Sequence, residues 1–466
     1  MSDDRAQALI QEAIRLRYSR RGVLKRASAL GLSATALRSV LAATGRAAPL
    51  RRAPAFLQTT SLTILAGTYF VPTAQDFFDQ QVQEWGKQNG VQVNTDYINW
   101  PDIQARIASA VEGGDGPDVI EMRETWPYLY YENMVPVDDI ATKVGEASGG
   151  YFDWVKNTVA VDGKWYSVPV GASSAAFAYR ISYLEKAGIA DPKNNFPKTW
   201  EELFTVGKKL KEMGKPIGQA LGHSTGDPPG FAYAYMWAYG AMEVEEDGKT
   251  VAFNKPQFVD GMEKFIQAWK DGFDETGLSW DDSANNRAFL SDQIGATING
   301  SSIYLSAQEA KAGASKTDYK IVVDPADIWH ARLPAGPAGP FVQLGSWSYA
   351  AMKYSKNQDA AKELIAWWTA KDQFTKWLEA QKGYIIPMAP GYADLSVFTS
   401  DPSLAPYPEV AKIARSRGYA GPSNQKAAEV SSRYIVVDTF AQAIQSGDAK
   451  GAIERGAQQL ERIYGR

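Results

Sequence analysis

The segment Ser61-Leu62-Thr63-Ile64-Leu65-Ala66-Gly67 opens an alternation of strands and helices that decides the fold class of this chain. Its apolar and β-branched residues predict a strand that ends at the glycine. Apolar spacing and cap residues then predict a helix, a strand, a helix and a strand, in that order, over residues 73–89, 91–97, 101–111 and 117–120. This order predicts an α/β fold with a parallel sheet and right-handed crossovers.

The same alternation continues toward the C-terminus. Thr199, followed three residues later by Glu202, forms a capping box and predicts a helix that begins there. Strands are predicted over residues 166–170, 175–179, 293–299 and 341–352. Helices are predicted over residues 256–269, 360–370, 372–382 and much of 427–464. No short-period repeat is found, so a solenoid or propeller is not expected.

The composition bounds the class of protein. The chain has 466 residues, 45% of them hydrophobic, with 14 Trp, 23 Tyr and 18 Phe, which is ample for two to four packed domains. It contains no cysteine, so disulfide scaffolds, thiol nucleophiles and zinc ribbons are excluded. His223 and His330 are the only histidines, which excludes a site with three histidine ligands.

Charge is unevenly distributed along the chain. Residues 1–55 contain 11 Lys and Arg against 3 Asp and Glu, a net charge of +8. The whole chain carries −4, so residues 56–466 carry −12. An acidic body lacks the basic footprint that nucleic acid requires, and we expect no nucleic-acid partner.

Residues 1–55 read as an export signal and a flexible arm. Residues 19–25 (SRRGVLK) resemble a twin-arginine signal, and a mildly apolar stretch and small-residue cleavage sites follow them. Cleavage after Ala47, Ala48 or Ala55 fits equally well. The alternative is a basic amphipathic arm over residues 5–26 that stays on the protein. The signal predicts a periplasmic or extracytoplasmic location, and without a cysteine no lipoprotein anchor is expected.

Motifs of common enzyme classes are missing. The sequence has no G-x-x-x-x-G-K-[ST] loop, no G-x-G-x-x-G after the first strand and no H-E-x-x-H. The segment 300–302 (GSS) lacks the frame of a nucleophile elbow. Carboxylate pairs such as Glu121 with Glu124 are expected by chance among 53 acidic residues, so a secreted glycoside hydrolase stays the alternative reading.

Several segments resemble the extracellular solute-binding proteins of ABC importers, specifically the carbohydrate class related to maltodextrin-binding protein. Residues 179–189 (YRISYLEKAGI) followed by 197–203 (PKTWEEL) are similar to the family's Y-N-K-x-L-x-x-x-A-G and P-x-T-W-x-E-L, although Arg-Ile-Ser replaces the usual start. Further matches, in the family's order, are 116–120 (GPDVI), 163–169 (GKWYSVP), 289–300 (FLSDQIGATING), 333–337 (LPAGP) and 355–361 (SKNQDAA).

The resemblance implies a two-lobed α/β fold, each lobe a mainly parallel sheet flanked by helices, with the ligand in the cleft between them. Lobe 1 would hold residues 58–169 and 344–388, and lobe 2 residues 170–343 and 389–466. It also implies a non-catalytic monomer, without cofactor or metal, that closes on a small-molecule ligand and delivers it to the membrane subunits of an ABC permease.

A sugar cleft needs aromatic rings for the C–H faces of the ligand and polar groups for its hydroxyls. Aromatic residues at predicted strand ends, loops and lobe crossings are the candidates: Trp100, Trp126, Trp237, Trp347 and Tyr384. Trp237 and Trp347 are predicted to stack on the ligand from opposite sides. The polar candidates are Glu121, Arg123, Ser173, His223, Asn299 and Ser301. His223 fits a cleft donor and a loop histidine bonded to backbone equally well, whereas His330 is expected to be structural.

The ligand class stays open at this stage. Proteins with the same frame take polyols, glycerophosphate-type ligands, polyamines or iron as well as sugars. An anionic ligand would favour clustered Arg or Lys, and Arg123 is the one evident cationic candidate. The sequence therefore favours a sugar, with a polyol or an organophosphate as alternatives.

Overall fold

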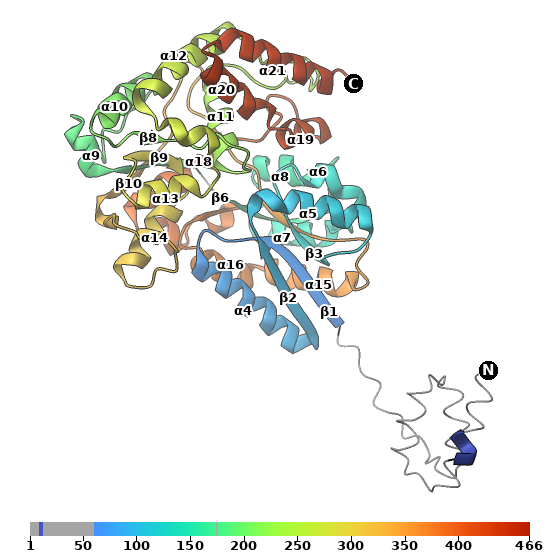
Figure 1. Cartoon of the computed structure of the whole chain (residues 1–466). Helices are drawn as coiled ribbons and strands as arrows, with labels where there is room; N and C mark the ends of the chain where they lie inside the picture. Colours follow the sequence, from blue (N-terminus) through green and yellow to red (C-terminus); the bar gives the residue numbers. More distant parts are fainter. Residues whose placement is uncertain (1–8, 13–59, 174) are drawn as a thin grey trace. The chain divides into compact units, whose positions relative to one another are not determined.

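Figure 1 shows the computed structural model, which describes residues 9–12, 60–173 and 175–466. Residues Thr60–Arg466 form one compact unit. The predicted twin-arginine motif and the three candidate cleavage positions lie outside the described residues. In the described ranges, no helix is both long and apolar enough to cross a bilayer.

A six-stranded sheet forms the first lobe. Its strand order is β13-β6-β12-β3-β1-β2. The bounds are β1 (Thr60–Gly67), β2 (Val91–Ile98), β3 (Val119–Arg123), β6 (Val168–Ser173), β12 (Trp347–Ala351) and β13 (Ile385–Pro387). Side chains alternate along β1, so Leu62 and Ile64 belong to the large core cluster and Leu65 to a smaller one.

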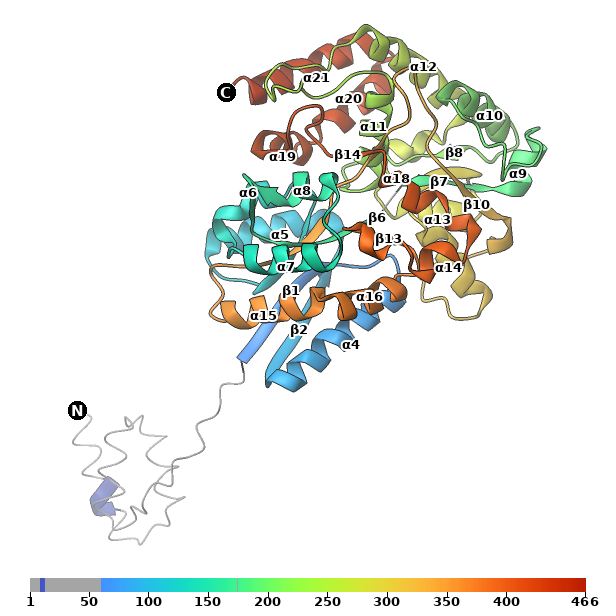
Figure 2. The ribbon, with the colours of Figure 1, turned by 180° about the vertical axis from the view of Figure 1, so that it is seen from behind.

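Helices cover both faces of this sheet (Figures 1 and 2). One face carries α4 (Pro72–Asn89), α15 (Gln358–Thr369) and α16 (Lys371–Ala380), which also pack against each other. The other face carries α5 (Trp100–Gly113), whose Ile103 and Ile107 pack with Leu65 of β1. The short helices α6 (Pro127–Tyr130), α7 (Asp138–Ala147) and α8 (Asp153–Val159) and the hairpin β4 (Ala160–Val161) with β5 (Lys164–Trp165) complete this lobe.

A four-stranded sheet forms the second lobe. Its order is β10-β7-β9-β8, with bounds β7 (Ala176–Arg180), β8 (Ile217–Gly218), β9 (Ala296–Asn299) and β10 (Ile328–Ala331). Its first helices are α9 (Ile181–Lys186), α10 (Trp200–Glu212), α11 (Asp227–Ala238), α12 (Pro256–Gly272), α13 (Ala284–Leu290) and α14 (Ser302–Lys311). The C-terminal helices α20 (Ile435–Ser446) and α21 (Ala449–Tyr464) pack on α11 and α12, and α19 (Gln425–Ser432) precedes them.

The predicted capping box is present at the start of α10. The Glu202 backbone N–H donates to Thr199 Oγ1 at 3.2 Å, and the Thr199 backbone N–H donates to the Glu202 carboxylate at 3.3 Å. Two of the unpaired N–H groups at this helix end are therefore satisfied, a contribution of about 1 kcal/mol to stability.

The predicted two-lobed α/β fold class is confirmed, but the sheets are mixed rather than mainly parallel. Strand β1 pairs in parallel with β2 and β3, whereas β12 pairs antiparallel with both β3 and β6. The strands that return from later in the chain enter the sheet in the opposite direction, and strand–helix alternation does not report this. The predicted strand over residues 341–352 is two strands, β11 (Val342–Gln343) and β12, and β11 pairs instead with β14 (Ala414–Arg415). The predicted lobe boundaries stay a proposal.

Candidate functional site

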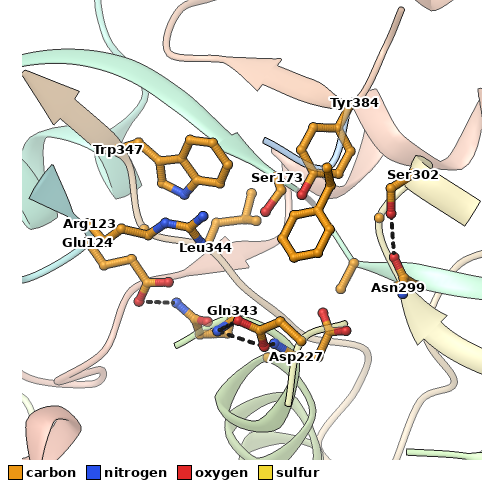
Figure 3. Close-up of a pocket in the computed structure, with 17 residues that line it drawn as sticks. Arg123, Glu124, Ser173, Asp227, Asn299, Ser302, Gln343, Leu344, Trp347 and Tyr384 are labelled. Carbon is orange, nitrogen blue, oxygen red and sulfur yellow. Dashed lines mark hydrogen bonds between the residues drawn. The ribbon is translucent and has the colours of Figure 1, made fainter. Parts of the chain in front are cut away.

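A deep cavity of about 40 Å³ lies between the lobes (Figure 3). Its walls include the ends of β3, β6 and β9, the start of β12 and the start of α11. Parallel strands gather their carboxyl ends at one edge, which is where ligands of open α/β sheets bind. In this arrangement of the lobes the cavity has room for only a few water molecules, so a larger ligand requires the lobes to move apart.

A wide cleft of about 680 Å³ adjoins this cavity. The two spaces share Phe70 and Asp282 in their walls. Trp100, at the start of α5, and Asp281 also line the wide cleft, so residues of both sheets' lobes face it. A cleft of this volume is in the range of small-molecule sites.

Arg123, the last residue of β3, is the central cation of the deep cavity. Its guanidinium carbon lies 3.3 Å from the Trp100 ring centroid and 3.8 Å from that of Trp347, so two indoles enclose it. The side chain is buried, and its Nε and Nη2 atoms have no hydrogen-bond partner among the described residues. Burial lowers the pKa of Arg123. Unpaired buried donors are costly, so this group favours a ligand that brings an acceptor.

Local backbone geometry places Trp100 against the arginine. The indole Nε1 donates to the Thr68 carbonyl at 3.0 Å. A Cβ atom at Gly67 would overlap the Trp100 ring, so the glycine lets the indole pack directly on the end of β1.

Glu121 lies on the same face of β3 as Arg123 because side chains alternate along a strand. It is buried and accepts a hydrogen bond from the Gly67 backbone N–H at 3.2 Å. Burial raises the pKa of Glu121 to about 7, although the Arg123 charge acts in the opposite direction. This carboxylate does not line the cavity and supports the arginine from within the lobe.

Two carboxylates of the second lobe, Asp227 and Asp282, face the cavity. Asp282 Oδ1 accepts from the Asp227 backbone N–H at 2.8 Å, and Asp227 Oδ2 accepts from Asn285 Nδ2 at 2.7 Å. Burial raises the pKa of Asp227, and the neighbouring Asp282 adds to the shift. Both side chains keep oxygen atoms that can bind ligand hydroxyls.

A buried ion pair joins the lobes at the cavity wall. Glu124, next to Arg123, lies 2.6 Å from Arg417 Nη2, and both side chains are less than 10% exposed. Gln343 Nε2 also donates to the Glu124 carboxylate, at 3.4 Å. Burial raises the pKa of Glu124, and Arg417 opposes this shift.

The structure brings five of the eleven predicted site residues together in the cavity wall. These are Arg123, Ser173, Asn299, Trp347 and Tyr384. Trp100 joins them through its contact with Arg123. Figure 3 shows Arg123 lying along the Trp347 ring, with Asp227 across the cavity from them. Asn299 is fixed by its neighbours, since its Oδ1 accepts from Ser302 Oγ at 3.1 Å and its Nδ2 donates to Asn286 Oδ1.

Trp237 does not reach the cavity, contrary to its predicted role. It lies near the end of α11, fully buried, and packs against Tyr233, Tyr419 and Phe341. Nearly every residue of α11 is buried, so a tryptophan on any of its faces packs into the core.

Four further candidates lie elsewhere. Trp126 packs in the smaller core cluster, and Ser301 is buried beside the cavity residues Gly300 and Ser302. His223 is largely exposed: its Nε2 lies 2.7 Å from Asp438 Oδ1, and its ring stacks on Tyr434. Glu121 is buried within the first lobe and does not line the cavity. His330 is structural as expected, with Nδ1 2.9 Å from the Ser403 carbonyl oxygen.

Sequence reasoning missed several wall residues. They are Phe70, Glu124, Asp227, Asp282, Ser302 and Gln343. One signal was available, because Gly226-Asp227-Pro228-Pro229 marks a helix start and backbone N–H groups there attract polar partners. Asp282 and Gln343 lie in segments whose pairing across the cleft is not visible from local sequence.

Two lobes around an internal polar and aromatic cavity define a binding protein that encloses its ligand. Residues 80–406 match the profile of the bacterial extracellular solute-binding proteins, and the chain belongs to this family. A Brucella abortus (strain 2308) protein, described by its name as a binding protein, is 23% identical over 345 residues, which are 73% of this chain and 79% of the relative. A Deinococcus radiodurans protein, named as an ABC transporter-binding protein, is 26% identical over 61% of this chain and 66% of its own length.

Solved structures share the fold. The maltose-bound protein MalE3 of T. maritima superposes with a TM-score of 0.72 at 19% identity, covering 87% of this chain and all of that one. A sugar transporter protein of Arthrobacter chlorophenolicus A6, with bound laminaribiose, gives a TM-score of 0.72 at 16% identity, over 86% of this chain and 99% of that one. The chain is therefore a solute-binding protein of the ABC-transporter type, and the family consists of binding proteins.

Proposed function

We propose that this chain captures a mono- or oligosaccharide between its lobes and delivers it to the membrane permease of an ABC importer. The observation that carries this proposal is the Arg123 guanidinium, which contacts Trp100 and Trp347, has two nitrogen atoms without a hydrogen-bond partner among the described residues, and lies opposite the carboxylates of the second lobe. Indole faces suit the C–H faces of a sugar, the arginine donates to its oxygen atoms, and the carboxylates accept from its hydroxyls.

The charges of the cavity favour a neutral ligand. A phosphate or carboxylate group next to Arg123 would also face the Asp282 carboxylate, and like charges across a small cavity repel strongly. An uncharged polyhydroxylated ligand satisfies the arginine and the carboxylates together. The bound ligands of MalE3 and of the Arthrobacter protein, maltose and laminaribiose, are of this chemical class.

A thermal-shift screen tests the proposal. The chain is heated with maltose, laminaribiose, glucose, ribitol and glycerol phosphate, each in large excess. A ligand that binds only the folded state stabilises it by about 2.7 kcal/mol at one hundred times its dissociation constant. We expect at least one sugar to raise the melting temperature and glycerol phosphate to leave it unchanged. A shift with glycerol phosphate alone would overturn the sugar assignment.

Catalysis is tested separately. We expect pure protein to release no reducing sugar from any oligosaccharide that it binds, over several hours. A glycoside hydrolase needs one carboxylate pair whose loss abolishes turnover. Turnover that disappears in Asp227→Asn or Asp282→Asn would establish the hydrolase instead.

Export by the twin-arginine route is part of the proposal, on the evidence of the motif at residues 19–25. Changing Arg20 and Arg21 together to Lys is expected to leave unprocessed protein in the cytoplasm. Normal processing and export of that double variant would contradict this route.

A further inference from the structure

A third space continues the wide cleft over the surface of the second lobe. This outer groove of about 670 Å³ shares Asp281 and Arg287 with the wide cleft. Since the wide cleft in turn shares Phe70 and Asp282 with the deep cavity, the three spaces lie one beside the next. Each of the two larger spaces is within the 300–1,000 Å³ that encloses a small-molecule ligand.

The outer groove has its own aromatic side chains. Trp280 and Tyr319 line it, and both are half-buried. Trp280 packs over Gly218 of β8, and both rings rest on the apolar cluster that includes Phe289 and Leu290. Their positions are therefore fixed by the core of the lobe, and their remaining ring surface faces the groove.

Carboxylates outnumber cations over the three spaces together, although the outer groove itself has Arg287 and Lys320 against Asp281. Arg287 lies 3.9 Å from Asp281 and donates to Ser283 Oγ at 2.8 Å, so its charge already has partners. The wide cleft adds the carboxylates of Asp102 and Asp318. A negatively charged chain would be repelled there, whereas an uncharged chain meets aromatic faces and hydrogen-bonding groups.

We propose that the outer groove at Trp280 and Tyr319 is a further binding subsite for a neutral oligosaccharide longer than a disaccharide. This inference rests on the proposed sugar-binding function. One end of the chain enters the cavity at Arg123 after the lobes move apart to admit it. Its middle part crosses the wide cleft past Trp100, and its far units stack in the outer groove. The lobes close on the near end, while the far end stays on the second lobe alone.

Calorimetric titration with disaccharides and tetrasaccharides tests the subsite. Maltose is compared with maltotetraose, and laminaribiose with laminaritetraose. In at least one series we expect the tetrasaccharide to bind about tenfold more tightly, the scale of one added aromatic contact. Trp280→Ala and Tyr319→Ala should each remove most of this gain and leave disaccharide affinity unchanged. Should Trp280→Ala not fold, Tyr319→Ala decides alone.

Trp329→Ala is the matched control. Trp329 is a half-buried tryptophan of the same lobe, 4.7 Å from Lys193 Nζ, and lines none of the three spaces. The Trp329→Ala variant should keep the full gain in affinity for the tetrasaccharide over the disaccharide. Three results would overturn the subsite and leave the sugar-binding function standing: equal affinity for both chain lengths, a gain that survives both groove variants, or binding of glucose only. Binding of no sugar would overturn both.

Discussion

Arg123 shows how one side chain can define a site. It makes cation–π contacts with two indoles, which are worth up to about 2 kcal/mol each when desolvated. These contacts keep the guanidinium in place without using all of its N–H groups. The donors without partners are buried in this arrangement, so a ligand oxygen that reached them would remove the cost of leaving them unpaired.

At the residue scale, substitutions of two tryptophans are expected to distinguish a ligand-binding residue from a core residue. Trp347→Ala is expected to weaken sugar binding by about 1–3 kcal/mol, or roughly tenfold to a hundredfold, because it removes one face of the cavity. Trp237→Ala should instead lower the free energy of unfolding by about 3–5 kcal/mol through a core cavity. Calorimetry and urea unfolding measure the two effects. The opposite pattern would reverse our assignment of these residues.

Glu121 gives a pH dependence of stability. Burial raises its pKa from 4.5 to about 7, so the folded protein binds this proton more tightly than the unfolded chain. The stability of the wild type relative to Glu121→Gln should therefore fall as pH rises from about 4.5 to 7, by about 3 kcal/mol, and stay level above. Urea unfolding of both proteins at pH 5 and pH 8 measures this. A difference independent of pH would show that Glu121 ionises normally.

Sequence patterns predicted the cavity residues that lie at strand ends. They did not predict correctly the position of a tryptophan on a helix that is buried on all sides. Arg123, Ser173 and Asn299 end strands, and the edge of a sheet gathers such residues. Residues 231–238 (FAYAYMWA) are apolar on all sides, a pattern that indicates a fully buried helix. This pattern favours a core position for Trp237 over a position in the cleft.

At the scale of the element, the end of β1 and the start of α5 form one unit through Gly67 and Trp100. Gly67→Ala is expected to push the indole away from Arg123, which should cost about 1–3 kcal/mol of stability and weaken sugar binding. Gly113→Ala, at the other end of α5, meets no atom within 4 Å and should be neutral or slightly stabilising. Urea unfolding and titration compare the two. Normal binding by Gly67→Ala would show that the Trp100 position is not required.

Local sequence predicted most elements of the first sheet because strand and helix periodicities differ. Chain order cannot report that β12 inserts between β3 and β6, since both pairings join residues far apart in sequence. Gln343 belongs to β11, which pairs with the distant β14, and Asp282 lies in a segment whose position at the cavity local sequence does not report. They therefore required the structure.

At the scale of the whole molecule, the Glu124–Arg417 pair stabilises the closed arrangement. Removing the cation leaves a buried carboxylate in the closed state, whereas opening would hydrate it, so Arg417→Met should disfavour closure. We expect sugar affinity to fall at least tenfold in titration calorimetry. Arg433→Met, which breaks the partly exposed ion pair with Glu429 of α19, should leave affinity unchanged. Equal affinities in all three proteins would contradict a role of the ion pair in closure.

Closure of the two lobes on a sugar is the central claim, and spin labels on either side of the cleft test it most directly. The chain has no cysteine, so Gln80→Cys and Ala314→Cys provide unique attachment points. Both positions are exposed and flank the Lys316–Asp76 ion pair that joins the lobes. The distance distribution between the labels is measured before and after addition of the sugar that stabilises the protein most. We predict that sugar shifts the distribution to a single short distance, and an unchanged distribution at saturating sugar would contradict the account.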